Sequence, residues 1–303
     1  MTIALPKIAI VYDRSMGKES SSHILTGLRA AFPTAPLYSS PLVQPGITKT
    51  LYHFFPKLRI GWFKKLDLSA FDVVISYGSD AKHTPKAHER QLHIHCSHGS
   101  TVEPALQVID TQAAQAVDIF VAISSHAQQF IKSHYDRPAT IVNPPVDTNL
   151  FTPARQRDNY YVLIDKQTPS GHTPLVIDSA AKLGIRLRVL TPADSEATLR
   201  SALNSAKGFI SLDATDFDVT QVEALAAGAF IVAYSPYDST DILQDSETGV
   251  LFHELTVEAI TAALKHAELT NSLPGTLRRK AKRFDTGLFV TKLRKIVFDN
   301  VRP

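Results

Sequence analysis

The sequence predicts an α/β protein with two doubly wound parallel-sheet domains, and three observations lead to this prediction. The chain has 303 residues, which at roughly 100–200 residues per domain is enough for two. Short apolar runs alternate with helical patterns of about 10–15 residues, as expected for parallel strands joined by right-handed crossovers. The proline-rich stretch 143–157 lies midway and separates two complete patterns. We therefore expect an N-terminal domain over 1–145, a C-terminal domain over 146–280 and a final segment over 281–303.

The first domain begins with the apolar run IAIVY, which is typical of a buried strand. Ile24, Leu25 and Leu28 then share one face of a helical pattern over 20–32. Ser124 or Ser125 is suited to cap a second helix over 125–134. The predicted strands of this domain are 8–12, 71–76, 92–97, 119–124 and 139–142.

The second domain repeats this alternation. Its predicted strands are 160–164, 187–190, 208–212 and 229–234. Its predicted helices are 175–183, 193–206, 220–227 and 256–268. Thr256 is suited to cap the last of these helices. In such sheets ligands bind beyond the carboxyl ends of the strands, so we expect functional residues in the loops there.

Composition excludes several classes of protein. Hydrophobic residues make up 44% and charged residues 20%, which argues against disorder. The net charge of +3 is too small to indicate a nucleic-acid partner. Cys96 is the single cysteine, so no intrachain disulfide can form and a reducing compartment is suitable. Pro6, Lys7 and Asp13 interrupt any signal-peptide core, and no apolar run approaches the ~20 residues of a membrane span. We expect a soluble, cytoplasmic protein.

Several segments together resemble the family 4 glycosyltransferases of the GT-B fold, especially the bacterial mannosyltransferase-like members. These segments are KIAIVYD at the start, LDLSAFDVVIS from Leu66, LHIHCSHGS from Leu92, residues 120–151 and residues 216–252. The spacing from AISS to NPPVDTNLF is the most specific part. The resemblance covers nearly the whole chain and implies two Rossmann-like domains facing across a cleft, with the final helix crossing back onto the first domain.

The resemblance implies transfer of a hexose from a nucleotide-diphosphate sugar, GDP-mannose or a UDP-sugar, with retention at the anomeric carbon. The acceptor would be a glycan or a lipid-linked sugar in cell-surface polysaccharide synthesis, and no metal or other cofactor is expected. A departing diphosphate has to be stabilised by cations and helix N-termini. The altered motifs described next leave a second hypothesis, in which the chain is a catalytically inactive pseudo-glycosyltransferase that binds a nucleotide or a partner.

The donor-sugar motif is partly kept. Glu223 matches the second glutamate of the Glu-x7-Glu motif of this family, which holds the donor ribose; the alternative is a solvated helix glutamate. Thr215 stands where the first glutamate, which contacts the sugar hydroxyls, is expected. Asp216, or otherwise Asp213 or Asp218, is the candidate substitute.

The phosphate-binding positions are altered as well. The resemblance places Lys166 at the position of the family's arginine and Gly171 at that of its lysine, with His172 next to it. A lysine lacks the bidentate fork of arginine, and Lys166 is alternatively a surface residue of a loop. In the first domain the usual Gly-Gly turn is reduced to Gly17, which Lys18 follows. These two residues still suit an anion site at a helix N-terminus.

His98 falls where the family has a histidine at the reacting sugar, and is therefore the candidate catalytic residue; the alternative is a structural histidine. His93 and His95 alternate with it, and period two puts these two on one face of the strand. Cys96 points to the other face, so we expect no zinc site here.

Two basic stretches remain. Lys49–Lys65 carries five cations, no acid and five aromatic residues. It suits either peripheral contact with an anionic membrane or a loop whose aromatic side chains pack on the core. The tail 277–301 is basic and amphipathic, with Leu288, Phe289 and Leu293 at helical spacing. Core packing is the expected role of this tail, and no nucleic-acid motif accompanies it.

Overall fold

The computed structural model describes residues 5–14, 19–40, 57–99, 104–165, 171–213, 217–236, 240–243 and 246–301. The chain forms two compact units. One comprises Met1–Pro144 together with Gly287–Pro303, and the other comprises Pro145–Thr286. The chain thus passes from the first unit to the second between two prolines of the midway stretch, and it returns just inside the last helix.

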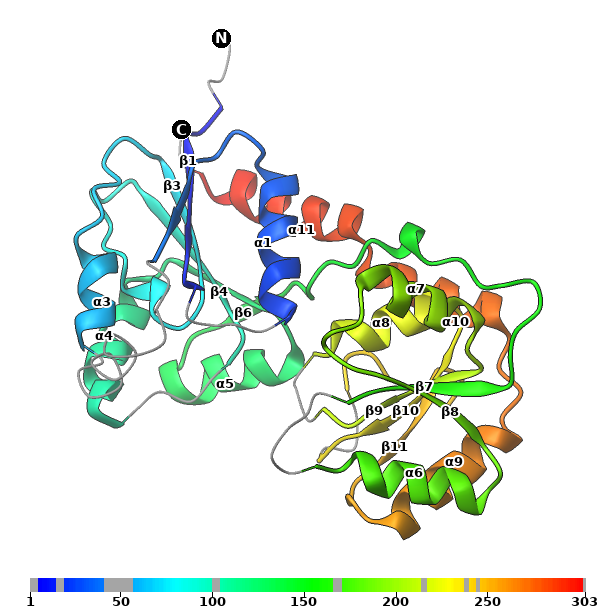
Figure 1. The fold of residues 1–303 in the computed structure, drawn as a ribbon. Coiled ribbons are helices and arrows are strands. Elements are labelled where there is room, and N and C mark those ends of the chain that lie inside the picture. The colour runs from blue at the N-terminus through cyan, green and yellow to red at the C-terminus, as the bar shows by residue number, and fades with distance from the viewer. Residues whose placement is uncertain are drawn as a thin grey trace. The chain divides into compact units, whose positions relative to one another are not determined.

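The first unit contains a six-stranded parallel sheet in the order β2-β1-β3-β4-β5-β6 (Figure 1). Its strands are β1 (Ile8–Tyr12), β2 (Leu37–Ser39), β3 (Val73–Tyr77), β4 (Leu92–Ser97), β5 (Ile119–Ala122) and β6 (Ala139–Ile141). Its helices are α1 (Glu19–Ala31), α3 (Lys57–Lys64), α4 (Gln107–Ala116), α5 (Ser125–Tyr135) and α11 (Thr286–Asn300). The strand order reverses between β1 and β3, which places the switch point of this sheet there.

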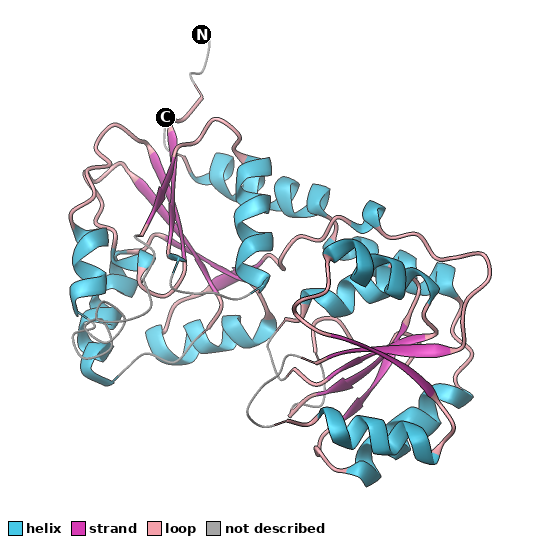
Figure 2. Ribbon diagram, in the orientation of Figure 1, coloured by secondary structure: helices cyan, strands magenta, loops and turns pink. Residues whose placement is uncertain are grey.

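Helices cover both faces of this sheet (Figure 2). On one face α1, α5 and α11 pack over Ile10 and Ile75 in a large core cluster. On the other face Phe63 of α3 packs with Val11 and Val74 in a smaller cluster. Successive residues of β1 therefore serve opposite cores, which is why its five residues form a continuous apolar run.

Helix α11 supplies the first unit with core residues from the far end of the chain. Phe289, Leu293 and Val297 recur at helical spacing and are all buried in its large cluster. The Arg294 Nε atom donates a hydrogen bond of 2.8 Å to the carbonyl of Ala31. This unit is therefore built from two segments that are distant in the sequence.

The second unit contains a five-stranded parallel sheet in the order β11-β10-β9-β7-β8. Its strands are β7 (Tyr160–Ile164), β8 (Arg186–Leu190), β9 (Gly208–Ser211), β10 (Phe230–Tyr234) and β11 (Gly249–Phe252). Its helices are α6 (Thr173–Lys182), α7 (Glu196–Ser205), α8 (Val219–Ala226), α9 (Val257–Leu269) and α10 (Pro274–Ala281). Helices α6 and α9 pack together over one face of the sheet, and α7, α8 and α10 over the other (Figure 1).

The two parallel sheets confirm the predicted fold class. Both predicted caps are present, since Ser124 Oγ accepts from Ala127 N at 3.0 Å and Thr256 Oγ1 from Ala259 N at 3.2 Å. The predicted strand 119–124 ends at Ala122 instead, because Ser124 already caps α5.

The structure also contains elements that the sequence patterns did not predict. These are β2, α3, α4, β11 and α10. β2 has only three half-buried residues at a sheet edge, which is too short for a clear alternation. α10 has only eight residues, of which Leu277 and Ala281 are buried.

The basic aromatic stretch 49–65 is described only from Lys57 onward. There Ile60 and Phe63 are buried, and Trp62 packs edge-on against Phe63 at a ring distance of 5.0 Å. For this part of the stretch the structure favours packing on the core. Among the described residues no helix has the length and apolar character needed to span a bilayer.

Candidate functional site

The second unit has a pocket at the carboxyl edge of its sheet, at the switch point. The strand order reverses at β7, which lies between β8 and β9, so a crevice opens beyond the ends of β7 and β9. A cavity of about 250 Å³ occupies this position. Its polar lining comprises Asp165, His172, Thr173, Ser211, Asp213, Asp218, Thr220 and Tyr234.

Asp218 organises one side of the pocket as the N-cap of α8. Its Oδ1 atom accepts from the Thr220 backbone N–H at 3.0 Å, and its Oδ2 atom accepts from Ser211 Oγ at 2.7 Å. The end of β9 and the start of α8 are thereby tied together. The Thr220 hydroxyl lies at the pocket wall and is buried without a hydrogen-bond partner. It is a polar group that a ligand of the pocket can satisfy.

Glu223 lies on α8, three residues after Thr220 and so on the same side of the helix. The other seven residues of α8 are buried, whereas Glu223 is half-buried and has an interaction partner in the structure. It does not line the pocket itself. The structure therefore places this candidate one helical turn beyond the pocket wall.

His172 is a further candidate donor residue that the structure describes, and the alternative candidates Asp213 and Asp218 line the same pocket. It immediately precedes α6, forms no side-chain cap and lines the pocket. Gly171 before it has φ of +48°, which fits a turn leading into the helix. Five further candidates, Gly17, Lys18, Lys166, Thr215 and Asp216, lie outside the described residues.

In the first unit, His98 directly follows β4 at the carboxyl edge of the sheet. Its half-buried ring lies 6.4 Å from that of Tyr77 at the end of β3, and Tyr77 in turn stacks on Tyr12 of β1 at 5.9 Å. Gly99 has φ of +68°, and a Cβ atom there would lie 2.7 Å from the Cα atom of Ala127. Helix α5 therefore packs directly against the turn that follows His98.

Solved structures resemble this chain over nearly its whole length, although no family model and no curated protein match it. HepE from Anabaena, in complex with UDP and glucose, is 11% identical, with 97% of this chain and 100% of that chain covered and a TM-score of 0.72. A glycosyltransferase from Rickettsia africae ESF-5 is 13% identical, with 98% and 99% covered and a TM-score of 0.70. Sucrose-phosphate synthase from Thermosynechococcus elongatus is 11% identical, with 97% and 98% covered and a TM-score of 0.66.

The chain has the GT-B fold. At these identities the likeness concerns the fold alone, and the chemistry of each site has to come from this chain's own residues. The two carboxyl-edge sites described above, around His172 and Asp218 in one unit and around His98 in the other, are where ligands bind in open α/β sheets.

The remaining histidines of β4 are structural. His93 Nε2 and His95 Nδ1 both lie 2.8 Å from the Ser76 hydroxyl, and all three side chains are buried. Burial lowers the pKa of His93 to about 4 and that of His95 well below its usual range, so both rings are neutral near pH 7. Cys96, on the opposite face, is buried, and burial raises the pKa of its thiol to about 12. No group of three metal-ligating side chains is found among the described residues.

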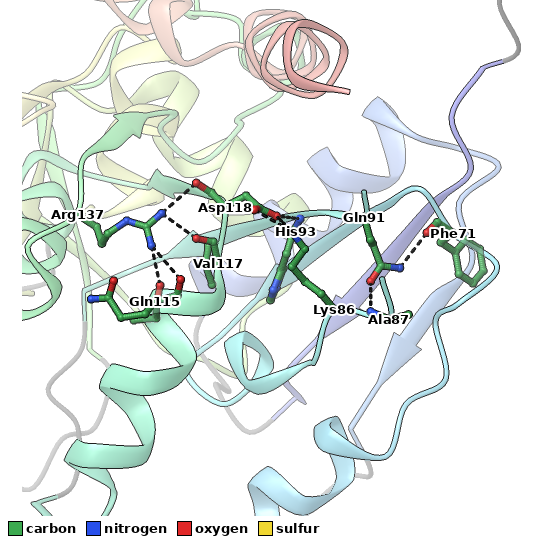
Figure 3. Close-up of polar contacts among 10 residues, drawn as sticks. Phe71, Lys86, Ala87, Gln91, His93, Gln115, Val117, Asp118 and Arg137 are labelled. Carbon is green, nitrogen blue, oxygen red and sulfur yellow. Dashed lines mark hydrogen bonds and ion pairs between the residues drawn. The ribbon is translucent and has the colours of Figure 1, made fainter. Parts of the chain in front are cut away.

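Asp118 anchors the amino end of β4, as Figure 3 shows. Its Oδ2 atom accepts from the His93 backbone N–H at 2.8 Å and pairs with Lys86 Nζ at 2.9 Å. Nearby, Arg137 donates to the carbonyl of Val117 at 2.8 Å. These contacts lie away from the carboxyl edge, and their role is to hold the sheet and the helix ends together.

A buried ionic cluster near the carboxyl edge was not predicted from the sequence. Lys82 Nζ lies 2.5 Å from Asp110 Oδ1, and the Tyr135 hydroxyl donates to Asp110 Oδ2 at 2.6 Å. His83 Nε2 lies 3.6 Å from the same carboxylate. Burial alone would raise the pKa of Asp110, but the contacts with His83, Lys82 and Tyr135, together with the charge of Lys82, outweigh it and lower that pKa. The residues of this cluster come from three separate segments of the chain. No local pattern in the sequence therefore indicates that they meet.

Proposed function

We propose that this chain is a glycosyltransferase that moves a hexose from a nucleotide-diphosphate sugar to a glycan or lipid-linked acceptor. The observation that carries the proposal is the pocket at the carboxyl edge of the second sheet, beside the start of α8. Ligands of open α/β sheets bind at such a switch point, and a helix N-terminus favours phosphate groups. Structures of similar fold are complexes with UDP and glucose and with UDP-glucose, which supports a nucleotide sugar as the ligand.

In this proposal the donor extends from Glu223, which accepts hydrogen bonds from the ribose, towards the ends of β7 and β9. Lys166 and His172 neutralise the diphosphate. Thr215 and Asp216 contact the sugar hydroxyls. Glu223 is suited to the task because it is the one residue of α8 that is not fully buried.

In the first unit His98 contacts the reacting sugar, and Gly17 with Lys18 helps to bind the phosphates.

The finer parts of the proposal rest on the sequence resemblance. These are retention at the anomeric carbon, membership of family 4, a GDP-mannose or UDP-sugar donor, and a cytoplasmic place in cell-surface polysaccharide synthesis. The proposal of peripheral membrane contact rests on the positive charge of the segment Lys49–Lys65. Liposome flotation tests it, and binding that does not depend on anionic lipid would contradict this proposal.

The negative charge of the pocket lining supports a second candidate function, in which the chain binds without catalysing transfer. Its described lining contains the carboxylates of Asp165, Asp213 and Asp218 but no arginine or lysine. A diphosphate carries about two negative charges, so donor binding depends on His172 and on Lys166. The second function is that of a catalytically inactive pseudo-glycosyltransferase, which binds a nucleotide or a partner without turnover.

Thermal unfolding with nucleotides tests the proposal. UDP, GDP, ADP, UDP-glucose and GDP-mannose are added at millimolar concentration. A ligand at 100 times its Kd adds about 2.7 kcal/mol, which at about 2–4 °C per kcal/mol raises the midpoint by several degrees. Nucleotides with one particular base are expected to stabilise the chain most. The Glu223→Ala variant is expected to show a shift of the unfolding midpoint at least fivefold smaller.

The matched control is Glu258→Ala, because Glu258 is an exposed helix glutamate of the same unit. This variant is expected to keep the full shift. No shift with any nucleotide would contradict donor binding. A sugar nucleotide that binds but is neither hydrolysed nor transferred to a panel of glycan and lipid-linked acceptors would support the second function.

A further inference from the structure

The second unit has another pocket, at the opposite edge of the same sheet. A cavity of about 260 Å³ lies at the amino ends of β7, β9 and β10, where Tyr161, Lys207 and Phe230 form part of its lining. Arg157 and Asn271 also line it. The residues around His172 and Asp218 belong to the carboxyl edge, so this second pocket shares no lining residue with the proposed donor site.

Arg157 carries a partly unused guanidinium at this pocket. Its Nη1 atom donates to the carbonyl of Gly228, just beyond the end of α8, where a cation is favourable. Its Nε and Nη2 atoms are buried and have no hydrogen-bond partner. These two N–H groups form the side-on edge of the guanidinium, which matches the two oxygens of a carboxylate or phosphate.

Among the described residues, no carboxylate forms an ion pair with Arg157. Burial lowers its pKa, which shows that the charged form loses hydration there. Lys207, the other cation of the pocket, is already paired, because Glu268 Oε1 lies 2.7 Å from its Nζ atom. Asp158 is the one acid among the described lining residues, and it is exposed and forms no ion pair with Arg157. An unpaired donor of this kind is costly unless an acceptor reaches it.

The walls around Arg157 are rigidly built. Gly228 has φ of +77°, and a Cβ atom there would lie 2.8 Å from Pro274 Cβ. A Cβ atom at Gly208 would lie 2.3 Å from the Tyr161 ring, whose hydroxyl is held by Glu268 at 2.9 Å. The remaining wall is the connection 270–273, which is exposed at Asn271. Because Nε and Nη2 of Arg157 are buried, binding at this edge requires a local movement of the pocket wall that admits the ligand.

We propose that this pocket binds a small ligand with a carboxylate or phosphate group through the Nε and Nη2 edge of Arg157. Drug-sized ligands occupy pockets of about 300–1,000 Å³, so a cavity of about 260 Å³ suits a small metabolite or inorganic phosphate. The inference does not depend on the proposed transferase activity, because it concerns the other edge of the sheet.

Isothermal titration with sodium phosphate and, separately, with sodium malonate tests the proposal against sodium chloride at equal ionic strength. Saturable binding of at least one of the two is expected, and the stronger one identifies the class of oxyanion. Arg157→Lys keeps the charge but lacks the side-on edge, so at least tenfold weaker binding is expected. Arg155→Gln removes an exposed arginine two residues away and is expected to bind as the parent protein does.

Asn271→Asp is a second variant, which leaves Arg157 and its contact with Gly228 in place. A negative charge at this rim is expected to weaken oxyanion binding severalfold, whereas the same change at exposed Asn300 in the other unit has no effect. The proposal is overturned if neither oxyanion binds above chloride, or if Arg157→Lys binds as tightly as the parent protein. UDP binding by these variants, measured in parallel, reports separately on the proposed donor site.

Discussion

At the level of single residues, Ser76 determines the state of two buried histidines. Its hydroxyl has one proton but lies 2.8 Å from both His93 Nε2 and His95 Nδ1. It therefore donates to one ring, which has to be neutral to accept, and accepts from an N–H of the other. Because burial also keeps the second ring neutral near pH 7, the tautomers of the two rings are fixed as a pair. The alternating histidines of HIHCSH thus support the sheet, and His98 alone reaches its carboxyl edge.

We predict that these histidines make stability fall with acidification. The folded pKa of His93, about 4, lies below the unfolded value of about 6.5, so between these values the unfolded chain binds more protons. Stability from this group is complete above pH 6.5 and is lost as the pH falls towards 4. For His93 the loss between pH 7 and pH 5 is about 2 kcal/mol, measurable by urea unfolding at the two pH values.

His93→Gln provides the comparison, because the Gln amide nitrogen can take the place of the ring Nε2 atom without titrating. The variant is expected to lose less stability than the parent protein over the same pH range. His88 is exposed, and His88→Gln is expected to keep the parental pH dependence. Equal pH dependence in all three proteins would show that His93 is not held neutral.

At the level of elements, the buried Asp110 joins three of them. It lies on α4, Lys82 lies on a 3-10 turn (Ala81–His83) after β3, and Tyr135 ends α5. The side chains of Lys82 and Asp110 are each only 5% exposed. A charge this deeply buried depends on its partner, because its hydration is lost.

We predict that Asp110→Asn destabilises the chain by about 3–5 kcal/mol, since it leaves the Lys82 ammonium buried without a counter-charge. Adding Lys82→Met to this variant is expected to recover part of the loss, as seen in a double-mutant cycle of urea unfolding. The exposed pair Lys295–Asp299 serves as the control, and Asp299→Asn is expected to have no resolvable effect. Additive effects of the two buried changes would rule out the pairing.

The turn between α8 and β10 depends on Gly228. We predict that Gly228→Ala costs more stability than Gly184→Ala, although both glycines have positive φ values, +77° and +65°. The backbone strain of about 1 kcal/mol is common to both. Only at Gly228 would the new Cβ atom also meet Pro274, at 2.8 Å, whereas nothing lies within 4 Å at Gly184. Thermal unfolding of the two variants measures the difference, and equal midpoints would contradict the close approach.

At the level of the whole molecule, each unit has its own core. Leu293 of α11 is fully buried in the first, and Leu225 of α8 is fully buried in the second. We predict that Leu293→Ala and Leu225→Ala each cost about 2–5 kcal/mol, with each change acting first on its own unit. Hydrogen exchange resolved by residue is the measurement. We expect Leu293→Ala to speed up amide exchange in β4, and Leu225→Ala to speed it up in β9. Faster exchange in the other unit instead would contradict the division of the chain into two separate cores.

The candidates His98, His172 and Glu223 were selected by the resemblance to the family 4 glycosyltransferases, and their roles stay predictions. The structure puts His98 and His172 at carboxyl edges of the two sheets. The interactions of Asp218 with Ser211 and of Asp110 with Lys82 were not predicted, because their partners come together only through packing. The oxyanion pocket at Arg157 likewise combines the midway stretch with the ends of three strands.

The parallel sheets and most of the strands and helices were predicted from the sequence, because hydrophobic period and capping are local properties. Five elements were not: β2, α3, α4, β11 and α10. Tertiary structure decided which polar side chains are buried together and which remain unpaired. These outcomes depend on contacts between distant segments, and their energies come from burial and charge pairing that no local stretch of sequence contains.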